Sequence, residues 1–154
     1  MKNFEFKNLD ISLVRSLVFF QKKYVKQLNE NVYFEEEIIS KLKSKTYYSN
    51  LCIKKGSVVG YILAQKILDF FEIHSLFVSP NFRRKGIAKT LLSNLIENCK
   101  NDRINKILLE FVEFNEAAKN LYLKNDFSIY GKRKDYYLIE NKRFNGILMK
   151  REFK

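Results

Sequence analysis

The 154-residue chain has no tryptophan, one proline, one histidine, two cysteines and five glycines. Because proline and glycine are scarce and no Ser/Gly-rich linker or internal repeat interrupts the chain, we expect a single domain covering residues 1–154. No apolar stretch approaches the roughly 20 residues that a membrane-spanning helix needs. The amino-terminal residues also lack the apolar core of a secretion signal. These absences favour a cytoplasmic protein without a membrane partner.

The few cysteine and histidine residues limit redox and metal chemistry. Cys52 and Cys99 stand far apart and outside any C-x-x-C spacing. In a reducing compartment such cysteines are expected to be buried thiols, and a single disulfide is the alternative. His74 is the only histidine, so no Cys/His cluster is available for zinc and we expect no metal. We interpret His74 as a structural residue.

The chain is strongly basic, with 29 Lys and Arg against 17 Asp and Glu and a net charge of +12. Such a balance favours polyanionic partners, including RNA, a ribosome surface or a phosphate-bearing cofactor. The basic residues are mostly lysines spread along the whole chain, so an ordinary solvated surface is the alternative. Charge alone therefore does not select a partner.

The distribution of apolar residues predicts an α+β domain with a mixed central sheet. Phe4 and Phe6 alternate with polar neighbours and predict a short first strand, and Asp10 is suited to cap a helix that continues to Leu28. Further predicted elements are a helix over 35–43, strands over 47–54, 58–66 and 70–78, a helix over 88–99, a strand over 106–114, a helix over 116–124, and strands over 127–139 and 146–152. The order of these elements favours the α+β class. Helices come early, an antiparallel meander follows, and two strand–helix units come after it.

A basic loop with one glycine joins a predicted strand to a predicted amphipathic helix. Backbone N–H groups at a helix start carry partial positive charge and bind phosphate. Gly86 lets the backbone approach an anion closely, and Arg83, Arg84 and Lys85 add positive charge. This placement predicts a phosphate-binding turn, with an ordinary basic turn as the alternative.

The segment Arg83-Arg84-Lys85-Gly86-Ile87-Ala88 resembles the Q/R-x-x-G-x-G/A loop of the GCN5-related N-acetyltransferase (GNAT) superfamily. The resemblance covers about residues 58 to 150 and includes residues 109–112 and 115–122. Within the superfamily, Phe127, residues 133–137 and residues 147–149 are similar to the bacterial ribosomal-protein-alanine N-acetyltransferases. The first 50 residues fit this family only in outline.

This resemblance implies the GNAT fold, a mixed and mostly antiparallel sheet of about seven strands flanked by about four helices. It also implies acetyl-coenzyme A (acetyl-CoA) as cosubstrate, with a main-chain N–H of the strand before the loop polarising the thioester carbonyl. The implied coenzyme-binding residues are Leu76, Phe77, Val78, Arg83, Arg84, Lys85, Gly86, Ile87, Ala88, Lys89 and Asn115. A helix N-cap is the alternative role for Asn115.

The resemblance further implies Glu110 as general base and Tyr122 as general acid. Strand alternation places Glu110 on the same face as Leu108 and Val112. Apolar neighbours desolvate a carboxylate and favour its protonated form, which suits a proton acceptor. Glu113 points to the opposite face and is a poorer candidate, while an exposed or paired strand-end carboxylate is the alternative for Glu110.

Tyr122 follows Asn115 by seven residues, which is two helical turns, so both side chains can face one cleft. A phenol with its ordinary pKa near 10 can protonate a departing thiolate. The alternative for Tyr122 is a core aromatic beneath the helix.

The implied reaction is a direct attack of an amine on the thioester, without a cysteine nucleophile. An α-amine has a pKa of about 7.7–8.0 against about 10.4 for lysine, so a single glutamate suits an α-amine better. The resemblance implies the N-terminal alanine of a small-subunit ribosomal protein as acceptor. The alternatives are a small amine or lysine acceptor, and a basic binding module without turnover. We expect a monomer or a weak dimer.

The chain departs from this branch near the expected acceptor groove. Leu138 stands where the branch has proline, and Phe144-Asn145 stands where it has an acidic pair. The resemblance implies a loop over residues 138–145 that borders the acceptor groove. These departures bear on acceptor specificity.

Overall fold

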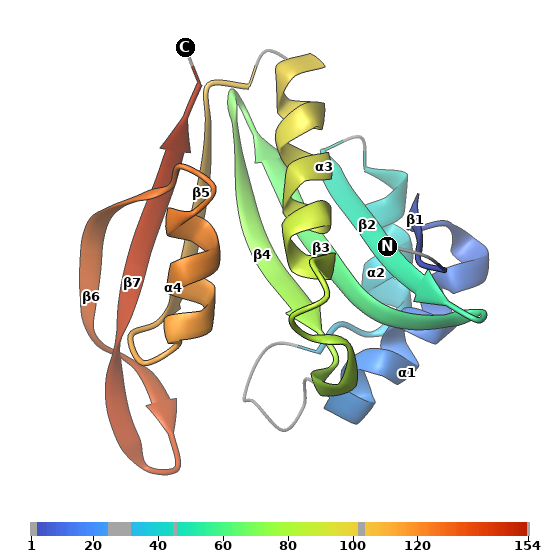
Figure 1. Ribbon diagram of the computed structural model, residues 1–154, viewed down its shortest axis with the longest axis horizontal. Coiled ribbons are helices and arrows are strands. Elements are labelled where there is room, and N and C mark those ends of the chain that lie inside the picture. The colour runs from blue at the N-terminus through green and yellow to red at the C-terminus, as the bar shows by residue number, and fades with distance from the viewer. Residues whose placement is uncertain (1–2, 25–31, 45, 102–103, 154) are drawn as a thin grey trace.

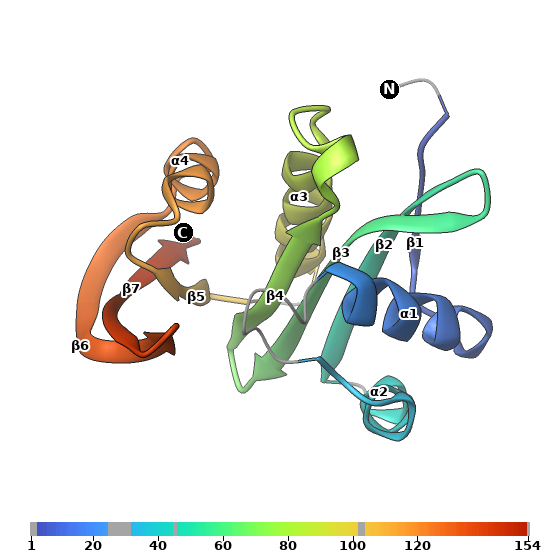
Figure 2. The same cartoon turned by 90° about the horizontal axis from the view of Figure 1, so that it is seen from below.

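The computed structural model describes residues 3–24, 32–44, 46–101 and 104–153. Its centre is a seven-stranded sheet of order β1-β2-β3-β4-β5-β7-β6. Strands β4 and β5 run parallel, and the other neighbouring pairs run antiparallel. Four α-helices lie over the two faces of the sheet (Figures 1 and 2). This arrangement confirms the predicted α+β class and the mixed, mostly antiparallel sheet.

The element bounds agree closely with the predicted ones, and β2, β4 and α2 have the predicted bounds. The strands are β1 (Glu5–Asn8), β2 (Tyr47–Lys54), β3 (Ser57–Ile67), β4 (Phe70–Val78), β5 (Lys106–Val112), β6 (Ser128–Ile139) and β7 (Lys142–Glu152). The α-helices are α1 (Val14–Tyr24), α2 (Glu35–Lys43), α3 (Ile87–Asn101) and α4 (Glu116–Leu123), and 3-10 turns cover Ile11–Leu13 and Pro80–Phe82. None of the described helices is long and apolar enough to cross a membrane.

Local chemistry explains where the first helical segment begins. The Asp10 side chain accepts a hydrogen bond from the backbone N–H of Ser12 at 2.9 Å, as an N-cap residue does. The capped segment begins as a 3-10 turn and continues as α1 to Tyr24. The predicted extension to Leu28 lies outside the described residues.

The carboxyl-terminal hairpin differs from the prediction. Strand β7 begins at Lys142 rather than at Gly146, so most of the expected loop over 138–145 is paired as the ends of β6 and β7. Only Glu140 and Asn141 form the turn, with φ values of 49° and 61°. Two consecutive left-handed residues are the geometry of a two-residue hairpin turn. The loop prediction was wrong because this turn lacks the glycine that usually marks it.

The sheet separates two buried clusters. Helices α3 and α4 pack over one face through Leu91, Leu95 and Tyr122, and α1 and α2 pack over the other through Leu17 and Ile38 (Figure 2). Burial of this apolar surface stabilises the domain and fixes both helix pairs on the sheet.

The two cysteines belong to the cluster beneath α3 and α4. Cys52 and Cys99 are both buried free thiols, which confirms the prediction for them. Burial raises the pKa of the Cys52 thiol to about 11. This thiol is therefore poorly suited to act as a nucleophile.

Strands β4 and β5 separate part of the way along their length (Figure 1). Their parallel pairing covers only Phe70 to Ile73 of β4 against Lys106 to Leu109 of β5. On the other side of β4, Ile73 pairs with Ala64 and the next paired residue is Ser75, so His74 is an inserted bulge residue. A bulge bends its strand, which explains why β4 leaves β5 at this point.

Candidate active site

A cleft of about 500 Å³ opens where β4 and β5 separate. Four of the predicted site residues, Leu76, Glu110, Asn115 and Tyr122, line it together. Its remaining walls include His74 and Ser75 of β4 and residues 136–139 of β6. The cleft thus joins β4, β5, α4 and the carboxyl-terminal hairpin in one concave surface.

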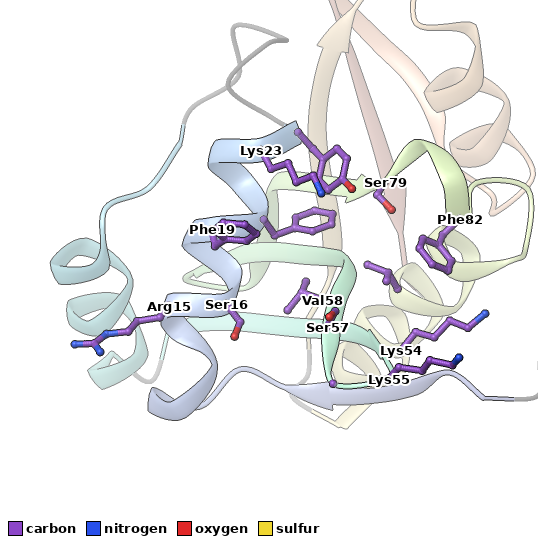
Figure 3. Close-up of a pocket in the computed structure, with 14 residues that line it drawn as sticks. Arg15, Ser16, Phe19, Lys23, Lys54, Lys55, Ser57, Val58, Ser79 and Phe82 are labelled. Carbon is purple, nitrogen blue, oxygen red and sulfur yellow. The ribbon is translucent and has the colours of Figure 1, made fainter.

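A larger hollow of about 720 Å³ lies between α1 and the turn from β2 to β3 (Figure 3). None of the predicted site residues lines it. Arg15 points away from this hollow and pairs with Glu35 at 3.5 Å, while the Lys54 amine lies 5.2 Å from the centre of the Phe82 ring. Since ligand sites need polar groups that converge, the smaller cleft is the better candidate.

The basic loop has the backbone geometry expected of a phosphate-binding turn. Gly86 adopts φ 79° and Arg84 adopts φ 58°, and α3 begins at the next residue, Ile87. The first turn of α3, which is fully described, carries no acidic residue. Arg84 and Lys89 are exposed, so the start of the helix combines positive side chains with the partial positive charge of its first backbone N–H groups. These residues fit a pyrophosphate.

Two of the basic side chains also hold the loop in place. Arg83 Nε donates to the Val78 carbonyl oxygen at 3.1 Å, and its guanidinium lies 5.5 Å from the centre of the Phe77 ring. Lys85 Nζ donates to the Asn81 carbonyl oxygen at 3.1 Å. The side chains of Phe77 and Val78 are buried in opposite clusters, so only the backbone of these two residues is available to a ligand.

Glu110 leaves β5 on the face opposite to α4. Its neighbours Leu109 and Phe111 are buried beneath α4, while the Glu110 side chain is 17% exposed. Arg133 Nε lies 3.2 Å from Glu110 Oε2. The side chain is therefore largely shielded from water, and its carboxylate is paired with a cation, which is the alternative that the sequence left open.

Asn115 and Tyr122 reach the cleft from the two ends of α4. The Asn115 side chain accepts a hydrogen bond from the backbone N–H of Ala118 at 3.1 Å, which confirms the N-cap alternative. Tyr122 is 6% exposed and packs against Phe111 and Phe127, with ring centres 6.0 and 5.4 Å apart. Tyr122 is thus a core aromatic and also part of the cleft wall.

Asn145 fastens the hairpin to the end of β5, a role that the sequence did not indicate when it marked this residue as a departure from the branch. Its backbone N–H and side-chain amide donate to the Glu113 carboxylate at 2.9 and 2.7 Å. Its side-chain oxygen accepts from the backbone N–H of Asp135 at 3.0 Å. The hydrogen bonds that Asn145 donates to Glu113, together with Lys132, hold the pKa of Glu113 below its usual range. Glu113 therefore has a structural role.

His74 lies at the mouth of the separation between β4 and β5. The His74 side chain is only 23% exposed, but the residue as a whole counts as exposed. Much of the surface that His74 presents to solvent therefore belongs to its main chain. Burial of the ring lowers the pKa of His74, and the nearby charges of Glu72 and Lys41 act in opposite directions. The sequence gives no signal for the bulge that places this residue in the cleft wall.

Comparisons with known proteins agree with this geometry. The acetyltransferase (GNAT) family matches residues 14–127. The [ribosomal protein bS18]-alanine N-acetyltransferase of Haemophilus ducreyi is 30% identical over 97 residues, which cover 62% of this chain and 67% of that protein. The match thus spans about two thirds of the length of this relative.

Two solved structures share the fold at low sequence identity. The ribosomal-protein-S18-alanine N-acetyltransferase of Escherichia coli superimposes with a TM-score of 0.82 at 20% identity, covering 96% of this chain and 92% of that one. Arabidopsis thaliana NAA60 in complex with acetyl-CoA gives a TM-score of 0.85 at 16% identity, covering 98% of this chain and 99% of that one.

Proposed function

The chain belongs to the acetyltransferase (GNAT) family, and from this premise we propose that it transfers an acetyl group from acetyl-CoA to the α-amine at a protein N-terminus. The observation that carries the proposal is the cleft in which Leu76, Glu110, Asn115 and Tyr122 meet. One wall is the edge of β4 beyond Ile73, which does not pair with β5 in the described part of the chain. The opposite wall carries the Glu110 carboxylate and the Tyr122 phenol. This combination supplies both a binding edge and proton-transfer groups.

The proposed coenzyme site follows the edge of β4 to the start of α3. Arg84, Gly86 and Lys89 bind the pyrophosphate, assisted by the N–H groups of the first helical turn. Arg83 and Lys85 hold the loop, and Ile87 and Ala88 begin the helix. The backbone of residues 76–78 and the side chain of Asn115 bind the arm that carries the thioester.

In the proposed reaction, Glu110 accepts a proton from the acceptor ammonium, directly or through one water. The neutral amine then attacks the thioester carbonyl carbon, and a backbone N–H of β4 stabilises the oxyanion of the tetrahedral intermediate. Collapse of the intermediate breaks the carbon–sulfur bond, and Tyr122 protonates the departing thiolate. The nitrogen of the intermediate loses its second proton, which restores the Tyr122 phenol through water, and Glu110 releases the first proton to solvent. Acetyl-CoA and an amine thereby give an amide and coenzyme A.

We propose the N-terminal alanine of a small-subunit ribosomal protein as the acceptor. The names of the curated relative and of the Escherichia coli structure support this choice, as does the lower pKa of an α-amine compared with lysine. Asn145 supports the second candidate, a small amine or a lysine side chain. This residue stands where the resembling branch has acidic residues, and its amide is bound to Glu113.

The test measures thiol release from acetyl-CoA with an Ala-initiated ribosomal peptide, a lysine peptide blocked at its N-terminus, and a polyamine. We expect one acetyl group on the peptide N-terminus, found by mass spectrometry. Glu110→Gln should abolish transfer while acetyl-CoA binding survives. Glu97→Gln removes an exposed glutamate of α3 that pairs with Lys100 on its own helix, and serves as the matched control.

Two outcomes would contradict parts of the proposal. Turnover of only the lysine peptide or the polyamine would retain the acetyltransferase and discard the protein N-terminus as acceptor. Acetyl-CoA binding without turnover of any acceptor would favour a binding module, whose affinity for RNA would then be measured.

A further inference from the structure

Arg133 is the one charged side chain among the described residues that forms an ion pair with Glu110. Resting on the proposed role of Glu110, we propose that Arg133 is a positioning residue that occupies the Glu110 carboxylate until the acceptor nitrogen replaces it. While the pair is formed, Glu110 is restrained from activating water against the thioester. Arg133 thereby restricts acetyl transfer to amines that can displace it.

The geometry places the guanidinium where an acceptor nitrogen has to bind. Arg133 Nε lies 3.2 Å from Glu110 Oε2, which is within the range of an ion pair. A proton donor to the same carboxylate must come within about 3.2 Å of it, or act through one water. An acceptor nitrogen and the guanidinium therefore compete for the same carboxylate.

The Arg133 side chain is bordered by solvent on about half of its surface, whereas the Glu110 side chain is mostly enclosed. Arg133 is 52% exposed and Glu110 is 17% exposed. The guanidinium also lies 4.8 Å from the centre of the Tyr136 ring, which lines the cleft. A cation on an aromatic face keeps a favourable contact after it leaves the carboxylate, so Tyr136 provides a second resting place.

The backbone that presents Arg133 is fixed independently of this ion pair. Strand β6 bulges after Arg133, because its pairing with β7 passes from Arg133–Gly146 to Tyr137–Phe144. The bulge is held by the hydrogen bond from Asp135 N–H to Asn145 and by a second, from Arg143 Nη1 to the Asp135 carbonyl oxygen at 3.1 Å. Substitution of Arg133 should therefore leave the bulge and the hairpin folded.

The restrained reaction is hydrolysis of acetyl-CoA. A water oxygen would attack the thioester carbonyl carbon, Glu110 would take the water proton, and the thiolate would leave with a proton from Tyr122. Acetyl-CoA and water would give acetic acid and coenzyme A, so the balance needs no further reactant. An ammonium acceptor carries a positive charge that can replace the guanidinium at Glu110, whereas a neutral water molecule cannot.

Removal of an ion pair that has one exposed partner changes a binding or conformational equilibrium by a factor of about two to five. For Arg133→Gln we expect acceptor-free thiol release to rise by about this factor. The KM for the Ala-initiated peptide should fall by a similar factor, because the competing cation is gone, and kcat should stay unchanged. Arg133→Lys retains a cation and should keep hydrolysis near the wild-type rate.

The matched control is Lys134→Gln, which removes the same charge from the next residue of the bulge without a contact to Glu110 among the described residues. The double variant Glu110→Gln/Arg133→Gln should lose the extra hydrolysis, which would assign it to the carboxylate. Unchanged hydrolysis and KM in Arg133→Gln, or a fall in kcat alone, would overturn the inference. If wild-type protein acetylates no amine at all, the proposed function fails instead, and the hydrolysis assay still tests Arg133.

Discussion

Gly146 of β7 lies directly against the Glu110 carboxylate of β5. A Cβ atom built on Gly146 would stand 3.0 Å from Glu110 Oε1 and 3.1 Å from its carboxyl carbon. The two residues are neighbours in the ladder, where Gly146 pairs with Val112 and Glu110 pairs with Leu148. Because glycine has no Cβ at position 146, the Glu110 carboxylate has room to lie beside the cleft.

Gly146→Ala should displace the Glu110 carboxylate and lower kcat by about tenfold, since small misplacements of reacting groups are costly. Acetyl-CoA affinity should not change, because the coenzyme loop lies on the other side of the cleft. The matched control is Gly131→Ala, whose Cβ would meet the end of the flexible Leu148 side chain at 3.0 Å. Equal kcat values for the two variants would contradict this explanation.

Gly86→Ala should weaken acetyl-CoA binding. The left-handed backbone at φ 79° costs a residue with a Cβ about 1 kcal/mol, and the loop would relax away from its anion-binding shape. Gly56→Ala is the control, because Gly56 has φ 74° and nothing within 4 Å of an added Cβ. Both variants should lose similar thermal stability, and only Gly86→Ala should raise the Kd for acetyl-CoA in a calorimetric titration.

Asn145→Ala should lower Tm at neutral pH by releasing the hairpin from Glu113. Because the folded protein holds the pKa of Glu113 below its ordinary value of 4.5, the stabilisation is present above that pH. It is lost as the pH falls further and the carboxylate takes up a proton. The difference in Tm between wild type and variant should therefore shrink from pH 7 to pH 3. A difference that is constant with pH would mean that Glu113 is not involved.

His74 should make the folded protein sensitive to mild acid. Burial lowers the pKa of its ring below the ordinary 6.5, so the unfolded chain binds a proton more readily than the folded one. The contribution of His74 to stability is present above pH 6.5 and decreases as the pH falls below it. His74→Gln should flatten the decline of Tm between pH 6.5 and pH 5, measured by thermal unfolding. A parallel decline in the two proteins would argue against this role.

Most elements of the fold could be predicted because their signals are local. The alternation of Phe4 and Phe6 around β1 and the capping residue Asp10 before the first helical segment each lie within a few consecutive residues. The β6–β7 turn was missed because Glu140 and Asn141 adopt left-handed conformations without a glycine. The bulge at His74 was missed because it depends on the register of β3 against β4.

The candidate site shows the same division between local and long-range signals. The loop geometry at Gly86 follows from residues next to it in the chain, and the positions of Asn115 and Tyr122 follow from one helix. The contact between Glu110 and Arg133 instead requires β7 to lie between β5 and β6, which no short pattern encodes. The interpretation of Glu110 as a carboxylate among apolar neighbours was therefore incomplete.

The four-pair contact between β4 and β5 has a further consequence for self-association. Beyond Ile73 and Leu109, two strand edges face a shared opening and are not paired with each other among the described residues. Unpaired edges are templates for strands of other molecules, and aggregation often begins there. Here the two edges line the cleft between β4 and β5, which can hold one extended ligand more readily than a second sheet. A ligand that fills this cleft should therefore cover the unpaired edges, as a paired strand would, and suppress heat-induced aggregation.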